Sequence, residues 1–338
     1  MQDDDDMQSG GGDGANTLNI DDRQSDSGNR PTQSGRMSRR GVLECMTWAG
    51  TAMVWTMVGG VPRARLVGRA EAATTNYSFV QVSDSHLGFD KPANPDTPGT
   101  FGAALQAVTR VPGQPRFLIH TGDITHLSKP GQFDLAAQLL TTTKLHTYTV
   151  PGEHDVLEDD GKSWINRYAK QEGAKGDGWY SFNDGGVHFI GLVNVMNLQG
   201  NGLGALGNDQ LEWLEKDVAG LTASTPVVLF AHVPLWTVYA DWGWGTADGA
   251  QALTYLKKFG SVTVLNGHIH QVMQKVEGHV AFHTARSTAF PQPAPGTAKG
   301  PGPMAVPPGE LRTYLGIAKV SLVSSNTPLA IVDTPLAG

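Results

Sequence analysis

Residues 77–86 read YSFVQVSDSH, so an apolar run from Tyr77 to Val82 is followed at once by Asp84 and His86. Short apolar runs of this kind are typical of strands buried inside a parallel sheet. Four more runs end one or two residues before a His or a group rich in Gly, Asp, Glu or His: Phe117 to Ile119, Tyr148 to Val150, Val227 to Phe230 and Val262 to Leu265. The carboxyl ends of neighbouring parallel strands meet in one crevice. The sequence therefore predicts one site built from all five groups.

The groups that follow the runs consist of residues that bind metal ions. They are Asp84-Ser85-His86, Gly122-Asp123, Gly152-Glu153-His154-Asp155, His232 and Gly267-His268-Ile269-His270. Carboxylates and imidazoles are ligands of transition metals in proteins. One of these histidines alone would most often have a structural role, but five groups in this pattern favour a dispersed metal site and hence an enzyme.

Strand-like and helix-like segments alternate along the chain. Amphipathic stretches at 100–111 and 132–143 separate the first three runs, which is the βαβαβ order of a parallel sheet with helical crossovers. Asp184-Gly185-Gly186 separates two apolar stretches, 179–183 and 187–193, and indicates a hairpin. Further segments are predicted as follows: helices at 208–218, with Asn208 as N-cap, and 250–258; strands near 279–283 and 316–322; and a surface loop rich in Pro and Gly at 291–309. One domain with two sheets explains this order best.

At this point the residues resemble the calcineurin-like metallophosphoesterases. The pattern of that family is D-x-H, G-D, G-N-H-D/E, a lone H and G-H-x-H, each after a strand, and all five blocks occur here in order between Asp84 and His270. The first block is closest to the branch with bacterial cyclic-nucleotide and glycerophosphodiester phosphodiesterases. The purple acid phosphatases are more distant relatives, because they carry Gly where His86 stands and Tyr where His126 stands. The resemblance implies an α/β fold, a four-layer α/β/β/α sandwich with two mixed β-sheets.

The resemblance also implies roles for single residues. Asp84, His86 and His270 would bind a first metal ion, Asp123 would bridge, and His232 and His268 would bind a second ion, with Glu153 completing its shell. The resemblance thus assigns His268 and His270, which stand in one loop, to different ions. The implied activity is hydrolysis of phosphomonoesters or phosphodiesters by metal-activated hydroxide, with two divalent or trivalent ions of Fe, Mn or Zn. His154 would be the general acid, and Asp155 would hold its ring in one tautomer.

One position departs from the family pattern, since Glu153 stands where the family has Asn. Glu153 could bind the second ion at some expense of anion affinity, or it could turn away and weaken that site. The second outcome leaves open a non-catalytic, metal-binding member of the fold. A nucleotide or lipid pyrophosphatase also stays open, because Trp236, Tyr239, Trp242 and Trp244 could form a pocket wall. His126, Trp236 and Arg286 are the candidate substrate-binding residues.

The N-terminal part differs from the rest of the chain. Residues 1–37 are polar and are predicted to be disordered, because they offer too little apolar surface to fold. Residues 38–72 resemble a twin-arginine export signal, with Arg39-Arg40, an apolar stretch at 45–60 and Ala70-Glu71-Ala72 as a cleavage site. This implies the export machinery as a partner, and a periplasmic or secreted domain at 73–338 without a stable membrane span after processing. The alternative is an uncleaved anchor or a buried helix.

Charge excludes one class of partner. Residues 1–37 carry three Arg and eight Asp, and residues 38–72 carry five Arg and two Glu, so the remaining part has a formal net charge of −5. It has no basic stripe to neutralise a nucleic-acid backbone. The predicted ligand is a small phosphorylated substrate, not a nucleic acid.

Overall fold

The structure, a computed structural model, describes residues 53–58, 61–66 and 77–337 in two units, Met1–Arg69 and Ala70–Gly338. In the first unit, β1 (Met53–Val58) pairs antiparallel with β2 (Val61–Leu66). The predicted disordered leader lies outside the described residues, and the predicted export segment is described only in these two strands. Both therefore stay predictions. None of the described helices is long and apolar enough to cross a membrane.

The first sheet of the second unit carries the βαβαβ order. Its five strands lie in the order β13-β12-β3-β4-β5. They are β3 (Ser78–Val82), β4 (Phe117–His120), β5 (His146–Thr149), β12 (Gly316–Ser321) and β13 (Ala330–Pro335). β3, β4 and β5 are parallel and are linked by α2 (Thr97–Thr109) and α3 (Pro130–Leu140), whereas β12 and β13 are antiparallel to their neighbours. The predicted crossovers are confirmed.

The second sheet has six strands in the order β10-β11-β9-β8-β7-β6. They are β6 (Tyr180–Asp184), β7 (Val187–Gly191), β8 (Val227–Phe230), β9 (Val262–Asn266), β10 (Met273–Glu277) and β11 (Val280–Thr284). β7, β8, β9 and β11 are parallel, and β6 and β10 are antiparallel edges. The predicted hairpin of β6 and β7 is confirmed, while β10 and β13 were not predicted.

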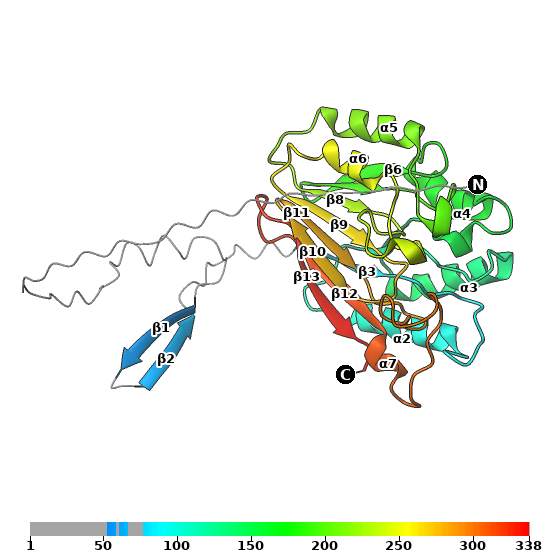
Figure 1. Cartoon of the computed structure of the whole chain (residues 1–338), viewed down its shortest axis with the longest axis horizontal. Coiled ribbons are helices and arrows are strands. Elements are labelled where there is room, and N and C mark those ends of the chain that lie inside the picture. Colours follow the sequence, from blue (N-terminus) through cyan, green and yellow to red (C-terminus); the bar gives the residue numbers. More distant parts are fainter. Residues whose placement is uncertain (1–52, 59–60, 67–76, 338) are drawn as a thin grey trace, which may run out of the picture. The chain divides into compact units, whose positions relative to one another are not determined.

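Alternating side chains place the two sheets face to face. In β3, Phe79 points inward and stacks on Phe117, with ring centroids 5.0 Å apart, and meets Phe189 of the second sheet edge-on at 5.3 Å. Its neighbours Val80 and Val82 point outward and pack in a cluster with residues of α2 and α3. The outer face of the second sheet is covered in the same way by α5 (Asn208–Ala219) and α6 (Gly249–Thr254). Helices thus cover both outer faces (Figure 1), and the α/β/β/α sandwich is confirmed.

Smaller elements complete the unit: α4 (Lys162–Arg167), α7 (Leu311–Tyr314), and the 3-10 turns η1 (Thr141–Thr143), η2 (Glu153–Asp155), η3 (Ala169–Glu172), η4 (Gly200–Gly202) and η5 (Ala240–Trp242). Two predicted details are wrong. The N-cap of α5 is Gly207, with a φ of 80°, and not Asn208, which is the first residue of the helix. The predicted helix at 250–258 ends at Thr254, after which the chain continues in turns. Residues 291–309 form no helix or strand, as predicted.

Candidate metal centre

The predicted ligands stand where parallel strands end, on a strained backbone. Asp84 and His86 follow β3, Asp123 follows β4, and His268 and His270 follow β9. All five have positive φ angles, between 40° and 70°. A non-glycine residue in this left-handed region costs roughly 1 kcal/mol, and Asp and His tolerate it better than most residues. Such strain gathers at functional sites, and here the chain turns sharply at each ligand.

Two glycines allow the ligand loops to approach each other. A Cβ on Gly122, which has a φ of 95°, would collide with the ring of His232. A Cβ on Gly152 would collide with the carboxylate and the backbone nitrogen of Asp123. Only glycine fits at these two positions, because the next ligand loop lies where a side chain would begin.

The first group of ligands consists of Asp84, His86, Asp123 and His270, all buried. Nε2 of His270 lies 3.3 Å from Oδ1 of Asp84 and 3.2 Å from Nε2 of His86. Nε2 of His86 in turn lies 3.3 Å from Oδ2 of Asp123. One ligand atom from each residue lies within 4.8 Å of the others, so these four side chains could hold one ion.

The second group consists of Glu153, His232 and His268. The two carboxylate oxygens of Glu153 meet one histidine each: Oε2 lies 3.0 Å from Nε2 of His232, and Oε1 lies 3.0 Å from Nδ1 of His268. Asp123 touches this group as well, because its Oδ2 lies 3.4 Å from Nε2 of His232. Asp123 therefore stands between the two groups, where a bridging carboxylate would stand.

Unsatisfied polar atoms indicate that these groups fit metal ions. The buried atoms without a hydrogen-bond partner include Oδ2 of Asp84, Oε2 of Glu153, Nε2 of His232 and both ring nitrogens of His268. Nε2 of His232 and Oε2 of Glu153 are close, but their geometry is not that of a hydrogen bond. A buried polar atom left unpaired costs about 1–3 kcal/mol. Several such atoms facing one another suit a bound cation, and the oxygen and nitrogen donors suit Fe, Mn or Zn.

Backbone carbonyls hold two of the histidines in the ligand tautomer. Nδ1 of His232 donates to the carbonyl of Thr121 at 2.7 Å, and Nδ1 of His270 donates to the carbonyl of Phe290 at 2.6 Å. Each bond leaves Nε2 free for an ion. The ring of Phe290 also stacks on His86, with centroids 4.8 Å apart. Phe290 was not predicted, although it lies in a loop after a strand-like run, as the ligands do.

In the metal-free protein the carboxylates and histidines balance each other's charge. Burial alone would lower the pKa of His232, but the carboxylates of Asp123 and Glu153 hold it well above its usual value. Burial alone would raise the pKa of Asp84, but His270 and His232 lower it to about 2. Carboxylates and histidines in the site therefore stabilise each other's charged forms. A bound cation could take over this role from the protons of the histidines.

The predicted contact between Asp155 and the ring of His154 is wrong. Nδ1 of His154 donates instead to the carbonyl of His126, at 2.7 Å. The buried carboxylate of Asp155 accepts hydrogen bonds from the backbone nitrogens of Ile124, Thr125 and Gly152, at 2.8–3.0 Å. Asp155 thus connects the loops that follow β4 and β5. This role could not be predicted from the spacing of side chains along the chain, because the donors are backbone nitrogens.

Of the three candidate substrate residues, only His126 lies beside the ligands. Its ring stacks on His154 at 4.8 Å and its Nδ1 lies 3.4 Å from Nδ1 of His86. Trp236 instead packs against Phe282, at 5.0 Å, within the cluster on the outer face of the second sheet. Nη1 of Arg286 donates to the carbonyls of Thr313 and Tyr314 at 3.3 and 3.2 Å. The structure does not bring Trp236 or Arg286 to the metal centre.

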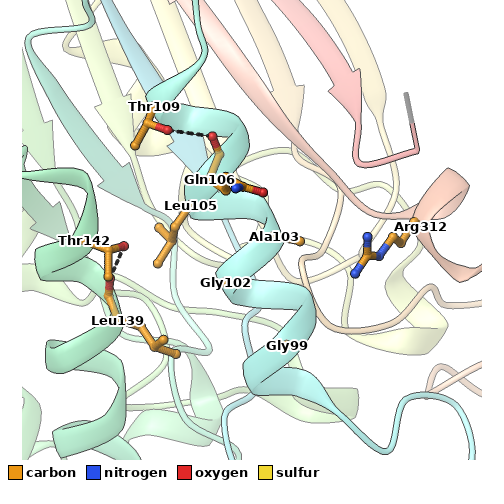
Figure 2. A pocket seen from close by; sticks show the side chains of 9 residues that line it. All are labelled: Gly99, Gly102, Ala103, Leu105, Gln106, Thr109, Leu139, Thr142 and Arg312. Carbon is orange, nitrogen blue, oxygen red and sulfur yellow. Dashed lines mark hydrogen bonds between the residues drawn. The ribbon is translucent and has the colours of Figure 1, made fainter.

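A cavity elsewhere does not compete with this site. It has a volume of about 530 Å³ and lies along α2, beside α3, and the side chain of Arg312 also lines it (Figure 2). Gly99, Gly102, Ala103, Leu105, Gln106, Thr109, Leu139 and Thr142 complete its lining. None of the candidate ligands lines it. The candidate site is therefore identified by its metal-binding atoms and is separate from this cavity.

The family of the chain follows from its sequence profile. The profile of the calcineurin-like phosphoesterases matches residues 77–272, more than half of the chain. The chain belongs to this family, and the matched region contains all seven candidate ligands. Proteins similar to it are named as phosphatases and phosphodiesterases, which agrees with the predicted class of activity.

Individual relatives match at low identity. Purple acid phosphatase 15 of Arabidopsis thaliana is 28% identical over 38% of this chain and 25% of its own length. A serine/threonine-protein phosphatase of Bos taurus is 27% identical over 50% of this chain and 57% of its own. A 3',5'-cyclic-nucleotide phosphodiesterase of Nostoc is 24% identical over 63% of this chain and 79% of its own. The chain therefore spans a quarter to just over half of the first two relatives.

A solved structure with the same fold is that of a dimetal phosphatase from Danio rerio. It superposes with a TM-score of 0.60 at 14% identity, over 77% of this chain and 96% of its own. At this identity the likeness shows the fold alone. Together with the purple acid phosphatase relatives, the family implies a dinuclear metal centre.

Proposed function

We propose that the protein hydrolyses phosphomonoesters or phosphodiesters at a dinuclear centre. Asp84, His86 and His270 would hold the first ion, and His232, His268 and Glu153 the second. Asp123 would bridge them. The observation that carries the proposal is the position of Asp123, whose Oδ2 lies 3.3 Å from Nε2 of His86 and 3.4 Å from Nε2 of His232. When bound, the two ions would supply Lewis-acid chemistry, activating water and neutralising charge on the phosphoryl oxygens.

The protein's own groups would orient the substrate and move a proton. His154 groups with Asp123 and Glu153, and its Nδ1 is fixed by the carbonyl of His126. Burial lowers the pKa of His154, but the carboxylates of Asp123 and Glu153 outweigh burial and raise it above its usual value. A protonated His154 can donate to the leaving oxygen of the ester, which is the role of a general acid.

The rival functions are less well supported by the geometry. A non-catalytic member in which Glu153 turned away would leave the second group incomplete, but both oxygens of Glu153 face the histidines of that group. The pyrophosphatase reading rested on the Trp-rich segment. Trp242 and Trp244 pack on Ile269 between the two ligand histidines, and Trp236 lies on the outer face of the second sheet. Trp242 and Trp244 thus support the ligand loop, whereas Trp236 lines a separate pocket that contains none of the candidate ligands.

A comparison of Asp123→Asn with wild type tests the function. Both proteins are loaded with Mn²⁺, Zn²⁺ or Fe, and hydrolysis of aryl phosphomonoesters and diesters is measured alongside metal content. We expect Asp123→Asn to lose about 10³-fold or more in kcat, since one carboxylate serves both ions. Wild type that binds two ions but turns over no ester would support the non-catalytic rival.

We also propose export of residues 73–338 by a twin-arginine route. The support is Arg39-Arg40 before an apolar stretch and Ala70-Glu71-Ala72 after it. Replacing both arginines by Lys should retain the protein in the cytoplasm of a bacterial host, measured by cell fractionation and N-terminal sequencing. Export of the Lys variant at the wild-type level would contradict this proposal.

A further inference from the structure

The carboxylate of Glu153 is directed at the two histidines of the second group of candidate ligands. Its oxygens each lie 3.0 Å from a ring nitrogen, Nε2 of His232 and Nδ1 of His268, and its side chain is only 25% exposed. A side chain that had turned away from the ion would not meet both histidines of the group. Glu153 therefore occupies a ligand position with a full negative charge, where the family pattern has the neutral oxygen of Asn.

This substitution changes the charge that the site presents to a substrate. Three of the seven candidate ligands are carboxylates, Asp84, Asp123 and Glu153, and the other four are imidazoles, which are neutral when they bind a metal. In the described part of the chain, no Lys or Arg forms an ion pair or hydrogen bond with these seven residues. Two divalent ions would thus leave one net positive charge, whereas an Asn at position 153 would leave two. These sums count only the seven ligands and the ions; a trivalent ion or a protonated His154 would raise both sums equally.

We infer that Glu153 makes the site selective for phosphodiesters, which carry one negative charge, over phosphomonoesters, which carry two. The inference rests on the proposed function and specifies its substrate class. Coulomb energy depends on the product of the charges. Removing one positive charge from the site therefore costs a dianion about twice as much interaction as it costs a monoanion.

The same carboxylate favours release of the product. Hydrolysis consumes one water, whose oxygen forms a new bond to phosphorus while the bond from phosphorus to the leaving oxygen breaks. The leaving oxygen takes one proton and departs as an alcohol, the second proton of the water passes to solvent, and the other product is a phosphomonoester. That product is a dianion at neutral pH, so Glu153 disfavours its retention and a second hydrolysis.

Binding of simple anions tests the inference. The Mn²⁺-loaded wild type and Glu153→Gln are titrated calorimetrically at pH 8 with inorganic phosphate, a dianion, and with dimethyl phosphate, a monoanion. We expect Glu153→Gln to bind phosphate about tenfold more tightly and dimethyl phosphate about threefold more tightly. Glu158→Gln is the matched control, because it removes the same charge from an exposed position five residues along and should change neither affinity. An equal gain for both anions, or none, would overturn the inference.

Metal content and wild-type turnover keep the test decisive. Elemental analysis shows whether Glu153→Gln retains two ions; if it loses one, Glu153→Asn replaces it, since the family uses Asn at this position. Wild-type kcat/KM for bis(p-nitrophenyl) phosphate should exceed that for p-nitrophenyl phosphate by about tenfold or more, whatever the variants retain. A monoester preference would refute the inference alone. Absence of turnover on both esters would refute the proposed function.

Discussion

The ring of His154 donates its Nδ1 hydrogen to the carbonyl oxygen of His126, at 2.7 Å, although 28 residues separate the two along the chain. This bond fixes the ring and leaves Nε2 as the nitrogen that can hand a proton to a substrate. A backbone carbonyl, and not the neighbouring carboxylate of Asp155, thus sets the orientation of the proposed general acid.

The first prediction concerns His154→Ala and the leaving group. An alkoxide needs a proton to depart, whereas p-nitrophenolate is stable without one. We expect His154→Ala to lower kcat by about 10²-fold or more for a dialkyl diester, which must release an alcohol, and by less than about tenfold for release of p-nitrophenolate. Steady-state kinetics with the two leaving groups measure this. An equal loss for both would argue against a proton-donor role.

The second prediction concerns Gly152→Ala. The new Cβ would meet the Asp123 carboxylate and displace it, so the variant should bind at least one ion fewer and lose about 1–3 kcal/mol of stability from overpacking. Gly131→Ala in α3 is the control, because a Cβ there meets no atom within 4 Å. It should keep both ions and gain up to about 1 kcal/mol, since Ala favours a helix. Elemental analysis and thermal unfolding separate the two variants, and equal metal content in them would contradict the prediction.

The third prediction links metal binding to protons. Burial would lower the pKa of His232, but Asp123 and Glu153 raise it well above its usual value, which favours a proton on this ring when no metal is bound. An ion can bind Nε2 only after that proton leaves. Metal affinity should therefore fall as pH falls, by about tenfold per unit for each proton released. Titration of Mn²⁺ in buffers with different ionisation enthalpies counts these protons, and a count of zero would show that His232 is already neutral.

The fourth prediction concerns the aromatic segment. Ile269 lies between the two ligand histidines of its loop and packs on Trp242 and Trp244. Ile269→Ala should cost about 2–5 kcal/mol of stability and also weaken metal binding, because the loop loses its support. Ile317→Ala, in a core cluster on β12, should cost a similar amount while leaving metal affinity unchanged. Competitive chelator titration and chemical denaturation give both quantities; unchanged metal affinity in Ile269→Ala would remove this role.

The parallel strands β3, β4, β5, β8 and β9 could be predicted because each contains or leads into a short apolar run that is followed by a candidate ligand. The edge strands β10 and β13 could not. Their side chains are largely exposed, with Val276 72% and Val332 59% exposed. β10 has no apolar run, and no Gly- and His-rich group follows the short apolar run that opens β13. Their pairing depends on neighbours that the local sequence does not name.

The candidate ligands could be located for the same reason, but the contacts that support them could not be predicted. Thr121 and Phe290 contact the ligand histidines through backbone carbonyls. Every residue type has this group, so the sequence does not indicate which carbonyl is used. Trp236 was assigned by its closeness in sequence to His232, yet it packs on the far side of the second sheet, against Phe282. A residue close in sequence to a candidate ligand can therefore point away from the site, because the path of the loop after the strand is not known from the sequence.

Backbone conformation limits which ligand positions of this metal centre can accept a different residue type. Five ligands have positive φ angles, which Asp and His accept and most longer or branched side chains resist, so exchange at those positions would require rebuilding a turn. Glu153 lies in the 3-10 turn η2, outside the left-handed region. Position 153 can therefore alternate between Asn and Glu without any cost in main-chain conformation, and evolution can retune the charge of the centre there while the scaffold stays as it is.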